Sequence, residues 1–326
     1  MKCEKSLTIN QTVTGDMPFS DAVYVASVNK IFGAMGPYVV QCNASTGAKE
    51  AVVRVAPVYG ESRLTYLAAT NQLFVSLWND PANQQQPPFA QANRQIFPVD
   101  PVGFTVGTAL ALWSHYGGTM AVGQGPRFVQ GFGNRVYFGY STAGNNVTFL
   151  YYDAVANTYR AGGGALNTGS FEVQHIAYDP IGLKLYVPYA FDPGIRSMDI
   201  DANYDTFNDT PGNYPVATVW CAANSKAYAV CGTTNLIRVD NQAGHTNTVI
   251  DISTAQFNAD PCRIRYNPGD QKLYMPCMTA EGIVVWDPAL NTGTFKAGFT
   301  NPIDVVFTGA KIFAVQNSAV GLKEIT

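Results

Sequence analysis

One short alternation of polar and apolar residues recurs seven times along the chain. Each copy reads long polar residue, aliphatic residue, aromatic residue: Lys30-Ile31-Phe32, Gln72-Leu73-Phe74, Arg135-Val136-Tyr137, Lys184-Leu185-Tyr186, Lys226-Ala227-Tyr228, Lys272-Leu273-Tyr274 and Lys311-Ile312-Phe313. Alternation with a period of two predicts β-strands. The aromatic residues follow one another at intervals of 39 to 63 positions. The chain is therefore predicted to contain seven similar β units.

A repeat of roughly 40–50 residues with four short strands per unit is typical of a β-propeller. We predict an all-β, seven-bladed β-propeller of four-stranded antiparallel blades, forming a single domain over residues 1–326. The expected blades are 19–56, 57–112, 120–163, 170–209, 213–253, 258–297 and 300–326. The last blade lacks a fourth strand, and residues 1–14 contain one to spare. We expect that N-terminal strand to complete the seventh blade and so remove an open sheet edge.

The recurring aromatic residue has a structural interpretation. A single blade cannot bury both of its faces alone, so each copy needs the same side chain to fill the space against its neighbour. Full burial of such a side chain stabilises the fold by about 2 kcal/mol. The third strand of most blades ends in Asp or Asn, which can bond the backbone two residues on and so open a turn. These residues are Asn43, Asp100, Asp153, Asp201, Asp240 and Asp287.

The chain resembles the YVTN/NHL-type seven-bladed propellers. The resemblance lies in the aliphatic-aromatic second strands and in third strands that end in "VVWDP" (284–288) and "IRVDN" (237–241). It covers nearly the whole chain and implies the architecture. Proteins of that architecture include lactonases, dehydrogenase subunits, carbohydrate and protein binders, and parts of virus particles, so the fold does not decide the function.

Composition and charge narrow the function classes. The net charge is −3, 13% of residues are charged and Lys and Arg form no cluster, which argues against a nucleic-acid binder. No apolar run reaches the length of a membrane span, and the N-terminus lacks the apolar segment of a signal peptide. We expect a virion or another extracellular assembly as the location, with the cytoplasm as the alternative. The six cysteines match no zinc pattern. Cys262 and Cys277 lie at the same end of the predicted hairpin and could be bridged if their Cα atoms are within about 7 Å.

Irregularities in the repeat indicate where partners bind. The insertions fall in the connections between second and third strands and between blades, at 79–94, 113–125, 161–170 and 189–194. Loops that a rigid scaffold presents commonly carry function, so we predict that this loop face makes the contacts. The candidate binding residues on it are Trp78, Phe89, Trp113, Tyr116, Tyr189 and Phe191.

A catalytic or metal site would need titratable groups at the starts of the first strands. Candidate metal ligands there are Asp21, Glu61, Glu172, Asp260 and Asp304. Converging carboxylates suit calcium, which takes six to eight oxygen ligands, and lactonase-like propellers use such a centre. However, Arg63, Arg127 and Arg263 lie beside them and would neutralise them. No catalytic motif is present, so we expect no catalytic residue, and no cofactor unless calcium occupies this set.

Three functions remain open at this stage. The first is a non-enzymatic structural or attachment protein of a larger assembly, such as a bacteriophage virion, with other protein subunits as partners. The second is a monomeric propeller that binds a glycan or a protein, including one on a host surface. The third is a calcium-dependent, lactonase-like hydrolase. Low charge and the abundance of Asn, Gln, Thr and Tyr favour the first.

Overall fold

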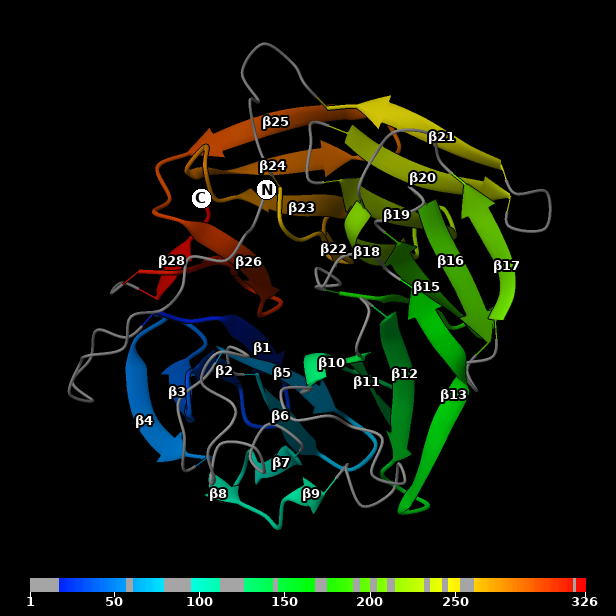
Figure 1. Ribbon diagram of the computed structural model, residues 1–326. Coiled ribbons are helices and arrows are strands. Elements are labelled where there is room, and N and C mark those ends of the chain that lie inside the picture. Colours follow the sequence, from blue (N-terminus) through cyan, green and yellow to red (C-terminus); the bar gives the residue numbers. More distant parts are fainter. Residues whose placement is uncertain are drawn as a thin grey trace. The chain divides into compact units, whose positions relative to one another are not determined.

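The computed structural model contains strands and turns and, among the residues it describes, no helix (Figure 1). The chain divides into two compact units, which we call unit 1, mainly Asn167–Asn317, and unit 2, mainly Ser6–Leu166. The described residues are 18–56, 61–78, 95–111, 126–142, 146–167, 175–189, 194–199, 204–209, 215–231, 235–241, 246–252, 261–318 and 321–326. None of them belongs to a helix long and apolar enough to cross a membrane.

Unit 2 contains three antiparallel sheets, which we call blades 1 to 3. Blade 1 consists of β1 (Asp21–Val25), β2 (Lys30–Met35), β3 (Tyr38–Asn43) and β4 (Lys49–Arg54). Blade 2 consists of β5 (Glu61–Leu67), β6 (Gln72–Trp78), β7 (Gln95–Asp100), β8 (Thr105–Val106) and β9 (Leu110–Ala111), with β8 and β9 both paired to β7. Blade 3 consists of β10 (Pro126–Phe132), β11 (Arg135–Thr142), β12 (Asn146–Asp153) and β13 (Thr158–Asn167).

Unit 1 holds the next three sheets, blades 4 to 6, each with four strands in chain order. Blade 4 consists of β14 (Ala177–Asp179), β15 (Lys184–Tyr189), β16 (Gly194–Asp199) and β17 (Tyr204–Asp209). Blade 5 consists of β18 (Pro215–Cys221), β19 (Lys226–Cys231), β20 (Asn235–Asn241) and β21 (Thr246–Asp251). Blade 6 consists of β22 (Arg265–Asn267), β23 (Lys272–Cys277), β24 (Gly282–Asp287) and β25 (Thr292–Ala297).

The seventh sheet, blade 7, has the order β26 (Pro302–Phe307), β27 (Ile312–Gln316) and β28 (Leu322–Glu324). The sequence-based prediction of an all-β fold with seven antiparallel blades is therefore confirmed. The predicted fourth strand of blade 7, within residues 1–14, lies outside the described residues. The link predicted at 161–170 is wrong over most of its length, because β13 continues to Asn167.

The seven recurring aromatic residues are all buried, as the repeat predicts. Phe32, Phe74, Tyr137, Tyr186, Tyr228, Tyr274 and Phe313 are each at most 4% exposed. Within unit 2, Phe32 packs in a cluster shared by blades 1 and 2, and Phe74 in one shared by blades 2 and 3. Within unit 1, Tyr228 packs against residues of blade 6 in the same way. These clusters explain why every blade repeats the same apolar side chain.

The Asp or Asn at the end of the third strand opens a turn in four of the six predicted cases. The side chains of Asn43, Asp100, Asp153 and Asp287 each accept hydrogen bonds from backbone N–H groups two and three residues ahead. Asp240 differs, because its carboxylate accepts bonds from the Arg238 and Thr248 side chains. The backbone two and three residues after Asp240 lies outside the described residues, as does Asp201, so the turn prediction stays a prediction at both positions.

Turns in unit 2 contain a further repeated contact. The left-handed backbone positions Asn29, Asn71 and Asn157 have φ values of 52°, 50° and 53°. The side chain of each accepts a hydrogen bond from the hydroxyl of the tyrosine five residues earlier, Tyr24, Tyr66 or Tyr152. Asn tolerates this conformation better than larger residues do, so the Tyr–Asn pair fixes both the turn and its side chain.

Candidate functional site

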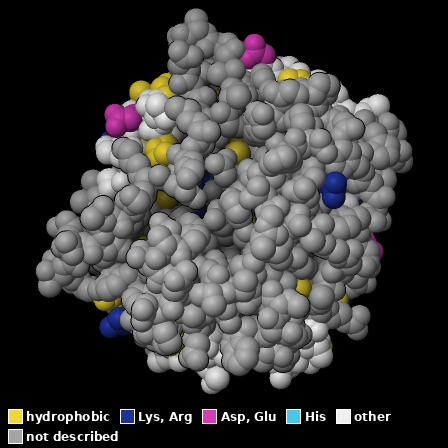
Figure 2. Space-filling view, in the orientation of Figure 1, with side chains coloured by type: hydrophobic (Ala, Val, Ile, Leu, Met, Phe, Trp, Pro, Cys, Tyr) yellow, Lys and Arg dark blue, Asp and Glu magenta, His cyan; other side chains and the backbone are white. Residues whose placement is uncertain are grey.

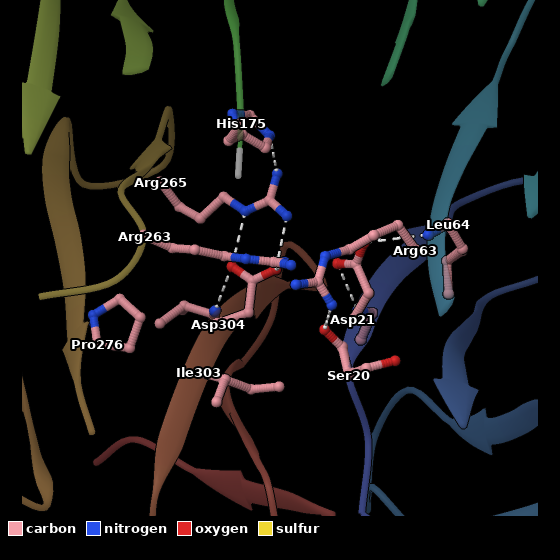
Figure 3. A network of polar contacts seen from close by, with 12 residues as sticks. Ser20, Asp21, Arg63, Leu64, His175, Arg263, Arg265, Pro276, Ile303 and Asp304 are labelled. Atoms are coloured by element: carbon pink, nitrogen blue, oxygen red, sulfur yellow. Dashed lines mark hydrogen bonds and ion pairs between the residues drawn. The ribbon is translucent and has the colours of Figure 1, made fainter. Parts of the chain in front are cut away.

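Asp304 and two arginines form the most deeply buried charged group among the described residues. Asp304 lies on β26, directly after a bulge between Pro302 and Asp304, and its side chain is 0% exposed. Arg263 Nη1 donates to Asp304 Oδ2 at 2.6 Å, and the Arg263 side chain is 4% exposed. Arg265, at the start of β22, binds the same carboxylate with Nε and Nη2 at 2.8 and 2.6 Å. The Arg265 guanidinium and the Asp304 carboxylate thus form a bidentate pair with two parallel hydrogen bonds (Figure 3).

The charges of this group determine the state of Asp304. Burial alone would raise the pKa of Asp304, but the neighbouring Arg265 and Arg263 charges outweigh it and hold that pKa well below its usual range. Asp304 Oδ1 also accepts a bond from the backbone N–H of Val305 at 2.8 Å. Both carboxylate oxygens are thus engaged in bonds that join blade 7 to blade 6, and the carboxylate stays ionised.

His175 extends this group towards blades 4 and 5. Its Nε2 lies 2.5 Å from Arg265 Nη1, and its Nδ1 lies 3.0 Å from the Thr218 carbonyl oxygen on β18. Removal of the ring from water and the charge of Arg265 lower the pKa of His175 well below its ordinary value of 6.5. We refer to His175, Arg263, Arg265 and Asp304 together as the Asp304 cluster, and all four belong to unit 1.

Asp21 occupies the corresponding first-strand position in blade 1 of unit 2, and it is 4% exposed. Its Oδ1 accepts a bond from the Ala22 N–H, and its Oδ2 accepts one from the Leu64 N–H on β5, both at 3.0 Å. Arg63 Nη1 donates to the carbonyl oxygens of Ser20 and Ser62 at 3.0 and 3.4 Å. These contacts join blade 1 to blade 2 through the backbone (Figure 3).

Two of the five predicted metal ligands can be judged from the structure. Asp21 and Asp304 direct their carboxylates at backbone N–H groups and guanidinium groups, a poor match for a calcium site, which needs several oxygens converging on one point. Glu61 begins β5, but its side chain, like Glu172 and Asp260, lies outside what the structure describes. Among the described residues, His, Cys, Asp and Glu side chains form no group of three or more that could hold a metal ion.

The predicted role of the arginines is correct at Arg263, which neutralises Asp304. Arg63 binds carbonyl oxygens, the Arg127 side chain is outside the described set, and the predicted neutralising role of both stays a prediction. Sequence reasoning missed Arg265 and His175. Arg265 follows Arg263 by two residues, and in a strand such residues share a face, so that spacing was the available signal. Nothing near His175 in the sequence indicates its partners, which come from two other blades.

The predicted binding residues lie at the margins of the described chain. Trp78 ends β6 and Tyr189 ends β15, but their side chains are not described. The loops 79–94 and 113–125 lie outside the described residues, and so do Phe89, Trp113, Tyr116 and Phe191. The predicted binding face therefore stays a prediction.

The described exposed apolar residues lie mostly in the opposite set of connections. Large hydrophobic side chains that are at least 44% exposed are Val52, Val102, Val155, Ile181, Leu183, Val249 and Leu290. Five of the seven occupy turns between first and second or third and fourth strands. On the face drawn in Figure 2, the described charged side chains appear as separate spots rather than one charged area. Single exposed apolar residues are normal in soluble proteins, so the turns alone do not define a contact surface.

The described cysteines are buried thiols and none forms a disulfide. Cys262 Sγ lies 3.7 Å from the Pro276 carbonyl oxygen, and Cys277 Sγ lies 3.4 Å from the Met275 carbonyl oxygen. The predicted option of a Cys262–Cys277 bridge is therefore not realised. Burial raises the pKa of Cys231 to about 12, and a thiol that stays protonated is a poor nucleophile.

Comparison with known proteins shows the fold and no more. No protein-family model matches the chain, and no curated protein matches it in sequence. Among solved structures, the chain is similar to one of the Kuenenia stuttgartiensis hydrazine synthase, with a TM-score of 0.75 over 97% of this chain and 98% of that chain. The identity is 12%. A likeness at that level supports the propeller fold, and function has to be argued from the residues themselves.

Proposed function

We propose that this protein is a non-enzymatic structural or attachment component of a larger assembly, and specifically of a bacteriophage virion. In this proposal the propeller is a rigid scaffold of the YVTN/NHL type. Its loop face, with the connections 79–94 and 113–125, contacts other protein subunits or a host-surface glycan or protein. The proposal concerns what the scaffold presents, since fold alone is compatible with many functions.

The proposal is carried by the bonding of Asp21 and Asp304, the two described carboxylates at the starts of the first strands. Asp304 binds Arg263, Arg265 and a backbone N–H group, and Asp21 binds two backbone N–H groups. A hydrolytic centre would need such carboxylates to hold a metal ion or to move protons. Here their oxygens join one blade to the next. This favours a scaffold over the lactonase-like alternative.

The test is where the protein is found in its native source. Antibody raised against the recombinant chain is used to follow it through density-gradient fractions of virus particles and of free protein. We expect the 35.1 kDa chain to band with the particles. Recovery solely as a free monomer would overturn the proposal in favour of a separate binding protein. Recovery as a free monomer with stoichiometric calcium, measured by metal analysis, would overturn it in favour of the hydrolase.

A matched pair of variants then tests the proposed face. Replacing residues 79–94 by a short Gly-Asn linker should reduce incorporation into particles at least tenfold while leaving the melting midpoint of the isolated chain unchanged. The control is the double variant Val102→Ser and Leu290→Ser, which removes two exposed apolar residues from the opposite turns. We expect normal incorporation of this control. If the control fails to incorporate and the loop variant succeeds, the assignment of the loop face is wrong.

A further inference from the structure

His175 connects strands of three different blades within unit 1. It immediately precedes Ile176 and β14 of blade 4, and its backbone forms an isolated parallel bridge with Ala217 of blade 5. The N–H of Thr218 donates to the His175 carbonyl oxygen at 3.1 Å. The ring then reaches both Thr218 of blade 5 and Arg265 of blade 6. One side chain thus lies where three first strands meet.

The partners of the ring dictate its protonation state. A guanidinium group can only donate hydrogen bonds, so Nε2 of His175 must accept the bond from Arg265 Nη1 at 2.5 Å. The Thr218 carbonyl oxygen can only accept, so Nδ1 must carry the proton and donate to it at 3.0 Å. The ring is therefore neutral with its proton on Nδ1. No second proton fits on Nε2 while Arg265 keeps its place.

Arg265 cannot move aside cheaply, because two of its nitrogens bind the buried Asp304 carboxylate. Among the described residues, the charged groups that act on the ring are Arg265 and Arg263 from blade 6 and Asp304 from blade 7, while β18 contributes the Thr218 carbonyl oxygen. A protonated ring would place one N–H group against another, beside a second positive charge. Protonation and the His175–Arg265 contact therefore exclude each other.

We propose that His175 is an acid-sensitive contact that holds the start of blade 4 against the first strands of blades 5 and 6 at neutral pH and releases it from both when the ring gains a proton. Protonation occurs in the opened form, in which the ring reaches water and the contact with Arg265 is broken. Acidification then favours opening by mass action. This inference stands on the contacts of unit 1 and does not depend on the proposed function.

The direction and size of the pH effect on the opening equilibrium follow from linkage between protonation and opening. The opened ring takes up a proton around its ordinary pKa of about 6.5, whereas the closed ring stays neutral. Opening is therefore favoured as pH falls below about 6.5 and is unaffected well above it. Between pH 7.5 and pH 5.0 the opening equilibrium constant should rise about 30-fold. Hydrogen–deuterium exchange of the Thr218 amide, corrected for the intrinsic exchange rate at each pH, measures this constant.

The matched variant is His175→Gln, since a Gln side chain can accept from Arg265 and donate to Thr218 but does not titrate. We expect its Thr218 amide to keep the neutral-pH protection down to pH 5.0. His245→Gln, which removes a different histidine, should retain the wild-type dependence. An increase of less than about threefold in the wild type would overturn the proposal, since linkage requires about 30-fold. An equal increase in His175→Gln would overturn it as well.

A second measurement tests whether protonation of His175 breaks the contact with Arg265, even if His175→Gln does not fold. The ring resonances of His175 in the wild-type chain are followed by NMR from pH 8 to pH 4.5. We expect the closed form to show no titration near pH 6.5, with loss of its signals at lower pH as the opened form gains population. A full titration of the folded form with a midpoint near 6.5 would show that the ring is protonated without breaking the contact, and the proposal would be wrong.

Discussion

The first strands of unit 1 and unit 2 use the same residue type in two different ways. Asp21 in unit 2 and Asp304 in unit 1 both accept a bond from the N–H group of the next residue. The second oxygen of Asp21 accepts from a backbone N–H group on the next blade. The Asp304 carboxylate instead binds two guanidinium groups from the preceding blade. The local bond recurs, whereas the bond to the neighbouring blade depends on what that neighbour offers.

This difference explains how a repeat acquires individual sites. The bond from the following N–H group is a local property of Asp and therefore appears in both units. A buried carboxylate next to arginines is costly to break but not necessarily stabilising overall, because desolvation opposes the attraction. At Asp21, unit 2 connects its blades through a bond to the backbone N–H group of Leu64. Unit 1 concentrates charge at the equivalent place, and His175 joins that charged group.

Removing the carboxylate charge should have the largest effect on stability, and the loss should be greater at Asp304 of unit 1 than at Asp21 of unit 2. In Asp304→Asn, Arg263 and Arg265 lose their common counter-ion while remaining largely buried, and such a loss destabilises by about 3–5 kcal/mol. In Asp21→Asn, one oxygen acceptor survives, and we expect a loss of about 1 kcal/mol, the value of a single hydrogen bond. Chemical denaturation of both variants measures the difference. Equal losses would show that the two carboxylates play equivalent roles.

Acidification should remove the contribution of Asp304 to the stability of the wild-type chain. The folded-state pKa of Asp304 is lowered, so its contribution to stability is complete above its unfolded value of about 3.9 and is lost as pH falls below that value. The free energy of unfolding should decline by up to about 1.4 kcal/mol per pH unit from this group. Urea denaturation between pH 5 and pH 2.5 measures the decline. Asp304→Asn should lack this part of the slope, and an unchanged slope in the variant would contradict the assignment.

Each unit contains a glycine packed tightly against an aromatic ring, and the two sites can be compared. A Cβ added at Gly282 of unit 1 would lie 2.1 Å from the Phe295 ring and 2.8 Å from the Lys296 carbonyl oxygen. At Gly33 of unit 2 the nearest atoms all belong to the Phe19 ring, the closest at 2.5 Å. Overpacking costs about 1–3 kcal/mol, and we expect Gly282→Ala to be the worse, because backbone cannot move away as a ring can. Thermal unfolding gives the ranking, and the reverse order would show that the Phe19 ring is held more rigidly than the Lys296 backbone.

The smallest expected effect concerns the turns. Where unit 2 has Asn29 and Asn71 in the left-handed conformation, unit 1 has Leu183 with φ 52° in the turn between β14 and β15. A branched apolar side chain disfavours this conformation by about 1 kcal/mol relative to Asn or Gly. Leu183→Asn should therefore stabilise the chain by up to about that amount, and Asn71→Leu should destabilise it. A fall in the melting midpoint of Leu183→Asn would indicate that Leu183 makes a favourable contact.

Much of the fold follows from local patterns. Period-two alternation predicted the strands, and the spacing of Phe32, Phe74 and the later aromatics predicted seven blades and their buried positions. Turn chemistry was correct at Asn43, Asp100, Asp153 and Asp287 because an Asx turn needs just the next two or three residues. The bonds that Arg238 on the same strand and Thr248 on the next donate to the Asp240 carboxylate were not predicted, because they depend on strand pairing.

Local sequence patterns therefore account for the architecture: the strand periodicity, the blade count and the apolar filling between blades. These depend on interactions that each repeat satisfies in the same way. The Asp304 cluster was decided by the tertiary structure alone. His175, Arg265 and Asp304 are separated by 90 and 39 positions along the chain, and only the packing of blade on blade brings them within hydrogen-bonding distance. Their protonation states are equally non-local, because the neighbours in space, and not those in sequence, determine which group carries the charge.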